Sequence, residues 1–160
     1  MRLFCTHARF VWRFVFLDIC IIKNVKNKAM ANPYSKYLKG EDKLQRAVIN
    51  YLELQHPDAV FTHPMNEGKR TPFEQYKMKY LGTKPGIPDL LIFTPNCHFN
   101  GLALELKYKY NKPTERQKKW LKWLKNCNWA AIWSNDLEQC IETIDKYFKN
   151  ELIMRNLDEV

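Results

Sequence analysis

The sequence has few cysteines, and no two of them are closely spaced. Its five cysteines are scattered along the chain without a C-x-x-C pair, and no histidine-rich cluster accompanies them. A structural zinc site takes four ligands at short paired spacings, whereas Cys97 and His98 offer only two adjacent ones. Scattered, unpaired cysteines are typical of reduced thiols. We therefore expect no zinc site and a cytoplasmic protein, which would work inside the host cell if it is viral.

A hydrophobic run long enough to cross a membrane is also missing. The apolar stretch from Phe10 to Ile22 has 13 residues and is interrupted by Arg13 and Asp18, whereas a transmembrane helix needs about 20 apolar residues. No small-x-small cleavage site follows, as a signal peptide would require. We expect neither secretion nor a membrane partner.

Residues 1–29 differ from the rest of the chain, and Met30 offers a second start. We expect residues 1–29 to be an N-terminal extension: an accessory strand, a poorly ordered segment, or sequence that is not translated. Residues 30–150 would form one domain, and residues 151–160 a C-terminal tail. Internal repeats and low-complexity tracts are absent, and 46% hydrophobic with 27% charged residues is an ordinary globular composition. This composition excludes a disordered or collagen-like chain.

Acidic residues are in the minority. Lysine and arginine total 26 against 17 aspartates and glutamates, which gives a formal net charge of +9. The residues that follow position 29 keep a net charge of +4, because the extension holds six basic residues and one acidic residue. An excess of positive charge favours an anionic partner, with nucleic acid ahead of a membrane surface.

Periodicity and capping signals divide the chain into alternating elements. Capping boxes at Thr71 to Glu74 and at Thr114 to Gln117 each open a helix. The predicted helices span 41–55, 71–82, 114–127 and 136–148, and the predicted strands span 59–63, 89–94, 102–108 and 129–133. This order predicts an α/β fold, a sandwich with a central mixed β-sheet flanked by helices. The helix and strand spacing of the tryptophans between residues 120 and 133 favours core packing over base stacking.

The predicted strand 102–108 contains the first residues that indicate a catalytic site. Its alternation places Ala103, Glu105 and Lys107 on one face. By itself this pattern is typical of a solvated strand face with an ion pair. Its context is different, because a hairpin over residues 95–101 would pair this strand antiparallel with the preceding one and bring Asp89 close to Glu105. Two carboxylates with a neighbouring lysine are the groups that Mg²⁺-assisted phosphodiester hydrolysis requires.

The residues around this pair resemble a known family. Gly86-Ile87-Pro88-Asp89, then Glu105-Leu106-Lys107 and Gln117, are similar to the motifs of the PD-(D/E)xK nuclease superfamily, and specifically of its VRR-NUC branch of small phage and bacterial stand-alone nucleases. The resemblance extends to residues 41–45, 63–70 and 114–117 and covers roughly residues 41–148. One departure is the acidic Glu67 in a loop where the family is expected to have glycine.

The resemblance implies a restriction-endonuclease-like fold with a divalent metal site. Asp89 and Glu105 would be the principal metal ligands, joined by the backbone carbonyl of Leu106 and by Glu41 from the first helix. Glu41 is also explained as an acidic residue that favours a helix N-terminus, and Glu53 is a weaker competitor for its place. Mg²⁺ is the expected metal, and Mn²⁺ accepts the same oxygen ligands.

The same resemblance gives roles to two further side chains. Lys107 would hold or activate the attacking water and offset charge on the scissile phosphate, so that Asp89, Glu105, Lys107 and Gln117 form the catalytic set. Gln117 would orient the site from the start of its helix. Its place in a capping box explains it equally well, and both interpretations stay open.

Basic residues surround the expected site. Residues 105–125 contain eight basic and two acidic side chains, a local charge of +6 that suits a phosphate backbone, although the outermost lysines are also explained as a solvated helix face. Lys69 and Arg70 precede a helix N-terminus, where backbone N–H groups favour anions. The predicted nucleic-acid-binding residues are Lys69, Arg70, Lys109, Lys112 and Arg116.

The sequence therefore predicts a metal-dependent DNA endonuclease, a hydrolase that cleaves phosphodiester bonds by metal-activated water and leaves a 5′-phosphate, with selectivity for DNA structure as a further expectation. DNA is the expected partner, no small-molecule cofactor is expected, and small nucleases of this type often act as homodimers. The alternative is a non-catalytic nucleic-acid-binding module that keeps the fold. The presence of Asp89, Glu105 and Lys107 together favours the enzyme.

Overall fold

The computed structural model describes residues 33–64 and 70–153. The predicted extension over residues 1–29, Lys69 and most of the predicted tail lie outside the described residues. The chain divides into two compact units, Met1–Pro57 and Asp58–Val160. No helix of the described ranges is long and apolar enough to cross a membrane.

The first unit contains the 3-10 helix η1 (Pro33–Tyr37) and the helix α2 (Gly40–Gln55). The Asp42 carboxylate accepts a hydrogen bond from the backbone N–H of Lys39 (2.7 Å) and so caps the start of α2. Val48, Tyr51 and Leu52 are buried at the helical spacing that the sequence predicts. The helix ends just before His56 and Pro57, because proline disfavours a helical conformation in the residue before it.

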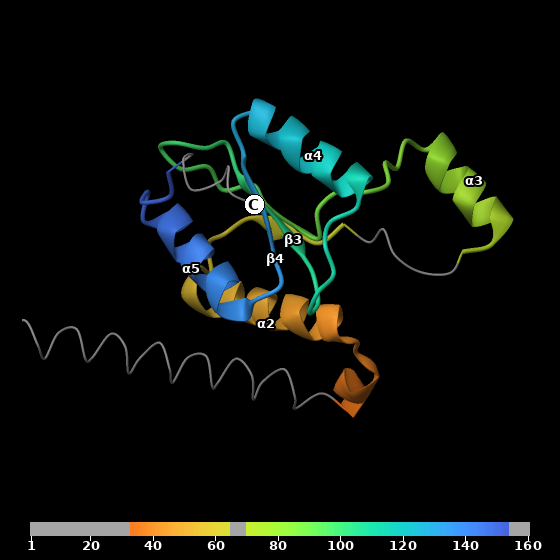
Figure 1. Cartoon of the computed structure of the whole chain (residues 1–160), viewed down its shortest axis with the longest axis horizontal. Helices are drawn as coiled ribbons and strands as arrows, with labels where there is room; N and C mark the ends of the chain where they lie inside the picture. Colours follow the sequence, from red (N-terminus) through yellow and green to blue (C-terminus); the bar gives the residue numbers. More distant parts are fainter. Residues whose placement is uncertain (1–32, 65–69, 154–160) are drawn as a thin grey trace, which may run out of the picture. The chain divides into compact units, whose positions relative to one another are not determined.

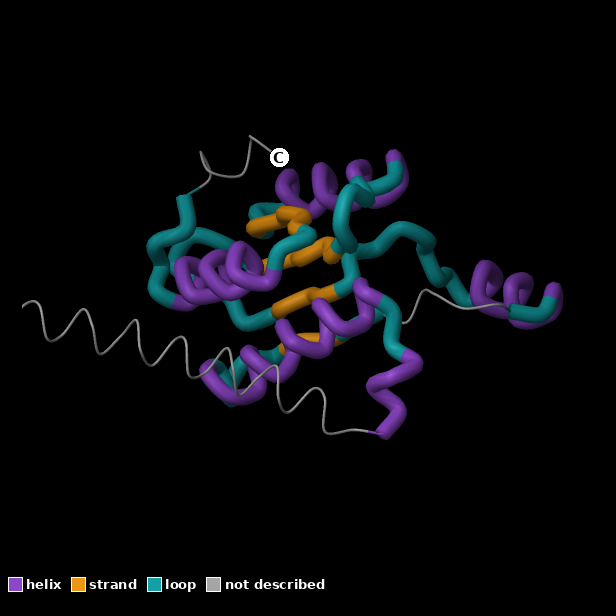
Figure 2. The backbone as a smooth tube through the Cα atoms, turned by 60° about the horizontal axis from the view of Figure 1, so that its bottom comes forward, coloured by secondary structure: helices purple, strands orange, loops and turns teal. Residues whose placement is uncertain are grey.

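The second unit is built on a mixed sheet (Figure 2). Within the described residues it has four strands, β1 (Phe61–Thr62), β2 (Leu90–Ile92), β3 (Leu102–Leu106) and β4 (Ala130–Ser134), in the order β1-β2-β3-β4. β2 is antiparallel to both of its neighbours, β1 and β3, whereas β4 is parallel to β3. The predicted α/β fold with a central mixed sheet is confirmed, and β4 forms an edge of the sheet.

Three helices complete this unit: α3 (Pro72–Tyr80), α4 (Glu115–Asn126) and α5 (Leu137–Phe148). The capping boxes predicted at Thr71 and Thr114 are both present, and Asp136 caps α5 by accepting from the Gln139 backbone N–H at 2.9 Å. α4 and α5 lie against opposite faces of the sheet (Figures 1 and 2). All residues of β2 and β3 are buried as a result.

The strands are shorter than predicted at most of their ends. Beyond β1 and β2 one backbone hydrogen bond remains, from the Phe93 N–H to the Val60 carbonyl (2.7 Å). The Val60 N–H itself donates to the Thr94 hydroxyl (2.8 Å), so a side chain takes the place of the next ladder bond. β3 ends before Lys109, whose φ of 54° is incompatible with an extended strand.

The core beneath α4 is formed by Leu91, Ala103, Leu121 and Ala131. The expectation that the tryptophans pack in the core holds only in part. Trp129 and Trp133 are partly buried against this cluster, whereas the Trp123 side chain is 55% exposed. Trp123 is exposed because it lies beside the apolar stripe of α4 and not on it. Leu121 and Leu124 are the residues of α4 that pack against β3 and β4.

Candidate active site

Two carboxylates meet where β2 begins and β3 ends. Leu90 pairs with Leu104 and Leu91 with Ala103 across the antiparallel strands. Continued by one residue, this register sets Asp89 opposite Glu105 on the face covered by α4. The Asp89 carboxylate accepts a hydrogen bond from the Leu106 backbone N–H (2.8 Å), which fixes it beside the end of β3. The juxtaposition inferred from the sequence is therefore present.

Glu105 is fully buried, and its two carboxylate oxygens have different surroundings. Oε1 lies 2.6 Å from Lys107 Nζ and accepts a hydrogen bond from the Gln117 side-chain amide. Oε2 is buried and has no hydrogen-bond partner. A buried carboxylate oxygen without a partner is costly, so this atom marks a position where a positive or hydrogen-bonding group would be strongly stabilised.

Burial and a like charge act together on Glu105. Its removal from water raises the pKa of this carboxyl to about 8, and the neighbouring Asp89 carboxylate adds to the rise, while Lys107 opposes it. A buried carboxyl with a raised pKa beside a second carboxylate is typical of functional sites, although structural ion-pair networks also shift pKa values. The pair is thus poised to accept a cation in place of a proton.

Lys107 is held by the end of its own strand. Its Nζ donates a hydrogen bond to the Leu106 carbonyl (3.0 Å) as well as contacting Glu105, and its backbone N–H donates to the Ser134 carbonyl (2.8 Å) on β4. The ammonium therefore lies between the carbonyl and the carboxylate that the resemblance assigns to the metal.

Gln117 makes contacts that fit both interpretations that the sequence leaves open. Its Oε1 accepts from the Thr114 backbone N–H (2.8 Å), which closes the capping box, and its Nε2 donates to Glu105. The cap holds the side chain at the first turn of α4, where its amide reaches the buried carboxylate.

His63 is a site residue that the sequence argument included in a motif but gave no role. Its Nδ1 lies 2.6 Å from the Asp89 carbonyl oxygen. Because a carbonyl only accepts, Nδ1 carries the proton and donates. This contact joins the segment after β1 to the start of β2. The sequence could not predict it, because the two residues are 26 positions apart.

The predicted ligand Glu41 lies in the first unit, on the first turn of α2, and is partly buried. Its competitor Glu53 is exposed and lies 3.8 Å from Arg46. No group of three or more histidine, cysteine, aspartate or glutamate side chains in the described ranges is arranged to hold a metal. The second unit by itself supplies the carboxylates of Asp89 and Glu105 and the Leu106 carbonyl.

The predicted nucleic-acid-binding residues have varied surroundings. Lys109, Lys112 and Arg116 are exposed around the start of α4, and Arg70 is partly buried just before α3. Lys109 Nζ lies 5.2 Å from the centre of the Tyr108 ring, a cation–π contact. The exposed positive charges of Lys109 and Lys112 therefore lie on the loop between β3 and α4, outside the buried carboxylate pair.

The donor set fits a hard divalent cation. Mg²⁺ prefers oxygen ligands, commonly one or two carboxylates, and keeps several waters. Asp89 and Glu105 supply this set, and no donor group reaches the buried Oε2 of Glu105 when this carboxylate is ionised. The hydrogen bond with Asp89 that helps to raise the Glu105 pKa requires a proton, and a cation would replace that proton.

Comparisons with known proteins agree with this geometry. The family model of the VRR-NUC domain matches residues 26–134. A solved structure titled "VRR_NUC domain protein" is 28% identical in sequence and superposes with a TM-score of 0.58, covering 70% of this chain and 90% of that one. Among curated proteins, none matches this chain.

Proposed function

Since this chain belongs to the VRR-NUC domain family, and its function is accordingly of the nuclease type, we propose that it is a metal-dependent DNA endonuclease. The observation that carries the proposal is the buried, partnerless Oε2 of Glu105 beside a second carboxylate, Asp89. A fold maintained only for binding gains nothing from this costly pair, whereas a metal-dependent hydrolase requires it.

The metal would be held by Asp89, Glu105 and the Leu106 carbonyl, all of which the second unit supplies. Mg²⁺ is the proposed ion, and Mn²⁺ would substitute for it because it accepts the same ligands. When bound, the ion would make water a nucleophile near neutral pH and polarise the scissile phosphate. Release of Leu106 from its contact with Lys107 would free the carbonyl for this role and the ammonium for the substrate.

Lys107 would hold the attacking water and neutralise charge on the phosphate as it accumulates. Water adds to phosphorus, the bond to the 3′ oxygen breaks, and that oxygen takes up a proton, which leaves 5′-phosphate and 3′-hydroxyl ends. Gln117 would keep the Glu105 carboxylate aimed at the ion, and His63 would fix the backbone at Asp89.

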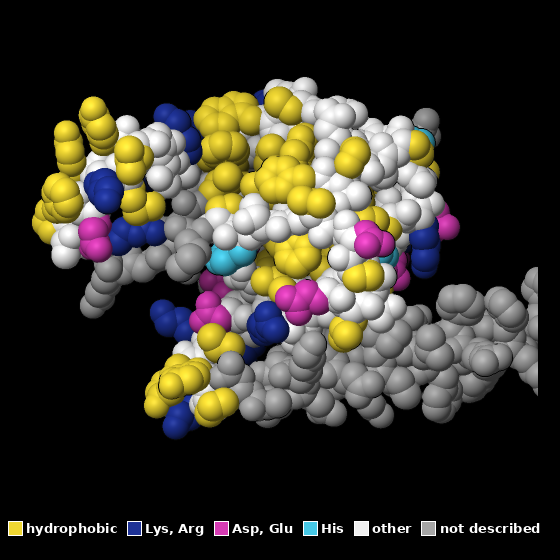
Figure 3. All heavy atoms as spheres, turned by 180° about the vertical axis from the view of Figure 1, so that it is seen from behind, with side chains coloured by type: hydrophobic (Ala, Val, Ile, Leu, Met, Phe, Trp, Pro, Cys, Tyr) yellow, Lys and Arg dark blue, Asp and Glu magenta, His cyan; other side chains and the backbone are white. Residues whose placement is uncertain are grey.

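A homodimer would let two such sites address two strands, and α3 offers a surface that supports it. No residue of α3 is buried, and its side chains of Phe73, Tyr76 and Tyr80 are each more than 60% exposed. Figure 3 shows hydrophobic side chains, drawn in yellow, gathered on this helix. The variant F73S/Y76S/Y80S should then elute as a monomer under conditions in which the parent elutes as a dimer.

Cleavage of supercoiled plasmid and of a branched oligonucleotide, with Mg²⁺ or with EDTA, tests the proposed activity. The Asp89→Asn and Lys107→Ala variants should lose on the order of 10²–10⁴-fold in rate. Glu142→Gln is the matched control, because it removes an exposed carboxylate of α5 that pairs with Lys146 at 2.7 Å. Nicking that persists in EDTA, or in Asp89→Asn at the parent's rate, would refute metal-dependent cleavage at this site. No nicking by the parent, with DNA binding intact and unchanged in both variants, would refute the nuclease and leave a nucleic-acid-binding module.

A further inference from the structure

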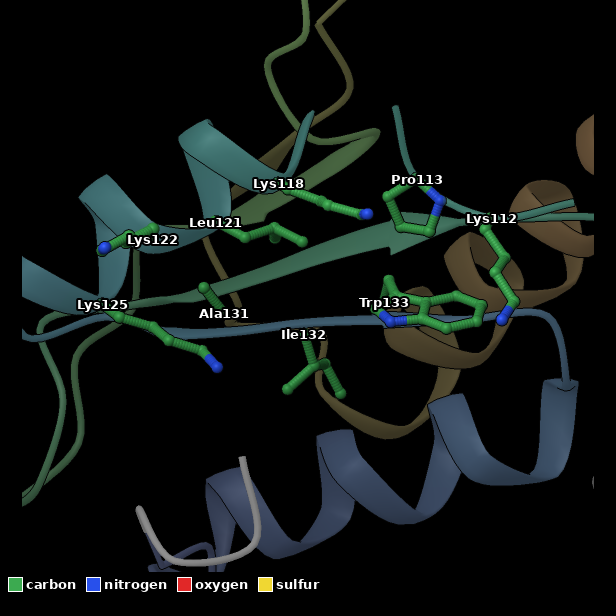
Figure 4. A pocket seen from close by; sticks show the side chains of 9 residues that line it. All are labelled: Lys112, Pro113, Lys118, Leu121, Lys122, Lys125, Ala131, Ile132 and Trp133. Atoms are coloured by element: carbon green, nitrogen blue, oxygen red, sulfur yellow. The ribbon is translucent and has the colours of Figure 1, made fainter. Parts of the chain in front are cut away.

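A lysine-lined groove lies beside the open edge of β4 in the second unit. Its cavity has a volume of about 610 Å³. Lys118, Lys122 and Lys125 line it from α4, Lys112 from the preceding loop, and Ala131, Ile132 and Trp133 from β4 (Figure 4). We call it the α4–β4 groove. It does not contain Asp89, Glu105, Lys107 or Gln117.

The charge in the groove follows from the helical repeat. Lys118, Lys122 and Lys125 are spaced four and three residues apart, so they form one stripe on α4. Like charges at these spacings repel one another and destabilise a helix. Lys118 contacts Glu115 at 2.8 Å, but that pair is exposed and gives little compensation. An anion in the groove would remove the repulsion.

The groove opens next to the catalytic strand. Trp133, which lines it, pairs in register with Glu105 across the parallel strands β4 and β3. Residues paired in this way place their side chains on the same face of a sheet. Lys118 also follows Gln117 directly in α4. A chain of phosphates lying along the groove would therefore lead toward the carboxylate pair.

We propose that the α4–β4 groove binds a single-stranded segment of nucleic acid next to the cleavage site. Its volume is that of a small-ligand cavity, which admits the sugar, phosphate and base of one strand but not a duplex. The lysines would contact phosphates, and the partly buried Trp133 offers an aromatic surface on which a base can stack. This inference rests on the proposed function, because it assigns the groove to that nuclease's own substrate.

Lysines beside an open strand edge have another explanation. They hinder pairing of that edge with a second sheet and so protect against aggregation. This protective role predicts no affinity for nucleic acid and no preference for single strands, so binding measurements separate the two.

The test is fluorescence anisotropy in EDTA, which prevents metal-dependent cleavage. The probes are a labelled twelve-nucleotide oligo-dT and a blunt duplex of the same length, and the variant is K118A/K122A/K125A. The matched control K77A/K79A/K146A removes three helical lysines outside the groove, of which Lys146, like Lys118, contacts a glutamate. Circular dichroism melts would verify that both variants are folded.

The groove variant should bind oligo-dT at least tenfold more weakly than the parent and the control. The slope of log K against log salt concentration should become shallower by about 2, because each phosphate contact on a single strand contributes about 0.7. Duplex affinity should change by less than twofold. Equal losses for duplex and single strand, or an oligo-dT slope equal to that of the control, would overturn the proposal, as would equally tight binding of poly-glutamate.

The two proposals fail in different ways. Binding of oligo-dT through the groove by a parent that cuts no DNA with Mg²⁺ or Mn²⁺ would overturn the nuclease and leave the groove supported. Metal-dependent cleavage by a parent whose groove variant keeps full affinity for oligo-dT would overturn the groove alone.

Discussion

Raising the pH from 5 to 8 in the absence of divalent metal should destabilise this protein. The cause is Glu105, whose carboxyl has its pKa raised from an ordinary 4.5 to about 8 by burial and by Asp89. Between these two values the folded protein holds a proton that the unfolded chain has released. The free energy of unfolding therefore falls as the pH rises, with the contribution fully present below 4.5 and lost above about 8.

The size of the effect follows from the linkage relation. One proton held only by the folded state gives a slope of at most ~1.4 kcal/mol per pH unit. Over the whole interval from 4.5 to about 8 the ceiling is ~5 kcal/mol, which is comparable with the total stability of many domains. Mg²⁺ should reverse the loss, since it binds the ionised carboxylates and stabilises the folded protein by mass action.

Urea denaturation in EDTA at half-unit steps of pH measures this slope, and Glu105→Gln provides the comparison. The substituted side chain cannot ionise, and the histidines are common to both proteins, so the difference between the two slopes isolates Glu105. The absolute stability of the variant is not the readout, because Lys107 also loses a charged partner. Parallel curves for parent and variant in EDTA would refute the reasoning, and so would a parent that Mg²⁺ stabilises no better at pH 8 than at pH 5.

Further predictions concern helix α4, the loop before β2 and the packing of α5. Gln117→Ala should reduce both stability and cleavage, whereas Thr114→Ala, which removes only the cap, should cost about 1 kcal/mol in urea denaturation and leave the cleavage rate per folded molecule unchanged. Gly82 and Gly86 both have a positive φ, so an alanine at either position should lower the free energy of unfolding by about 1–2 kcal/mol in urea denaturation. Gly86→Ala should cost more than Gly82→Ala, because only the Cβ at position 86 would meet another residue, 3.0 Å from the Cβ of Arg116. Tyr147→Phe should cost about 1 kcal/mol by thermal denaturation, since it removes a 2.7 Å hydrogen bond to the Thr94 carbonyl.

The order of elements was predictable because its signals are local. Thr71 and Thr114 each cap a helix through contacts within four residues of the chain, and Pro57 stops α2 in the same way. The antiparallel pairing that brings Asp89 near Glu105 was predictable too, but the exact register was not. Equal offsets from residues 95–101 align Asp89 with Lys107, whereas the observed register sets Asp89 opposite Glu105, a shift of two residues that keeps both carboxylates on one face. Strand ends were not, because they depend on contacts such as that of Thr94 with Val60, which join residues far apart in sequence.

The burial of the catalytic face was beyond the sequence pattern. Ala103, Glu105 and Lys107 alternate with leucines, and such alternation indicates one buried and one solvated face. Here α4 covers the polar face as well, so Glu105 and Lys107 are both buried. The residues that violate the pattern are the ones to which we assign catalysis under the proposed function, because a charge placed under a helix is costly unless a ligand compensates it.

Helix α4 shows why binding and catalysis would be coupled in this fold. Two adjacent stripes, each with spacings of four and three, run along it: Gln117, Leu121 and Leu124 cover the sheet and reach Glu105, while the lysines at 118, 122 and 125 line the groove. The stripes are one residue, or about 100°, apart, so packing of Leu121 and Leu124 sets the positions of both. A substitution that rotates α4, such as Leu121→Ala, should therefore weaken the contact with Glu105 and displace the lysines together, whereas changes to the lysines alone leave the carboxylate pair in place.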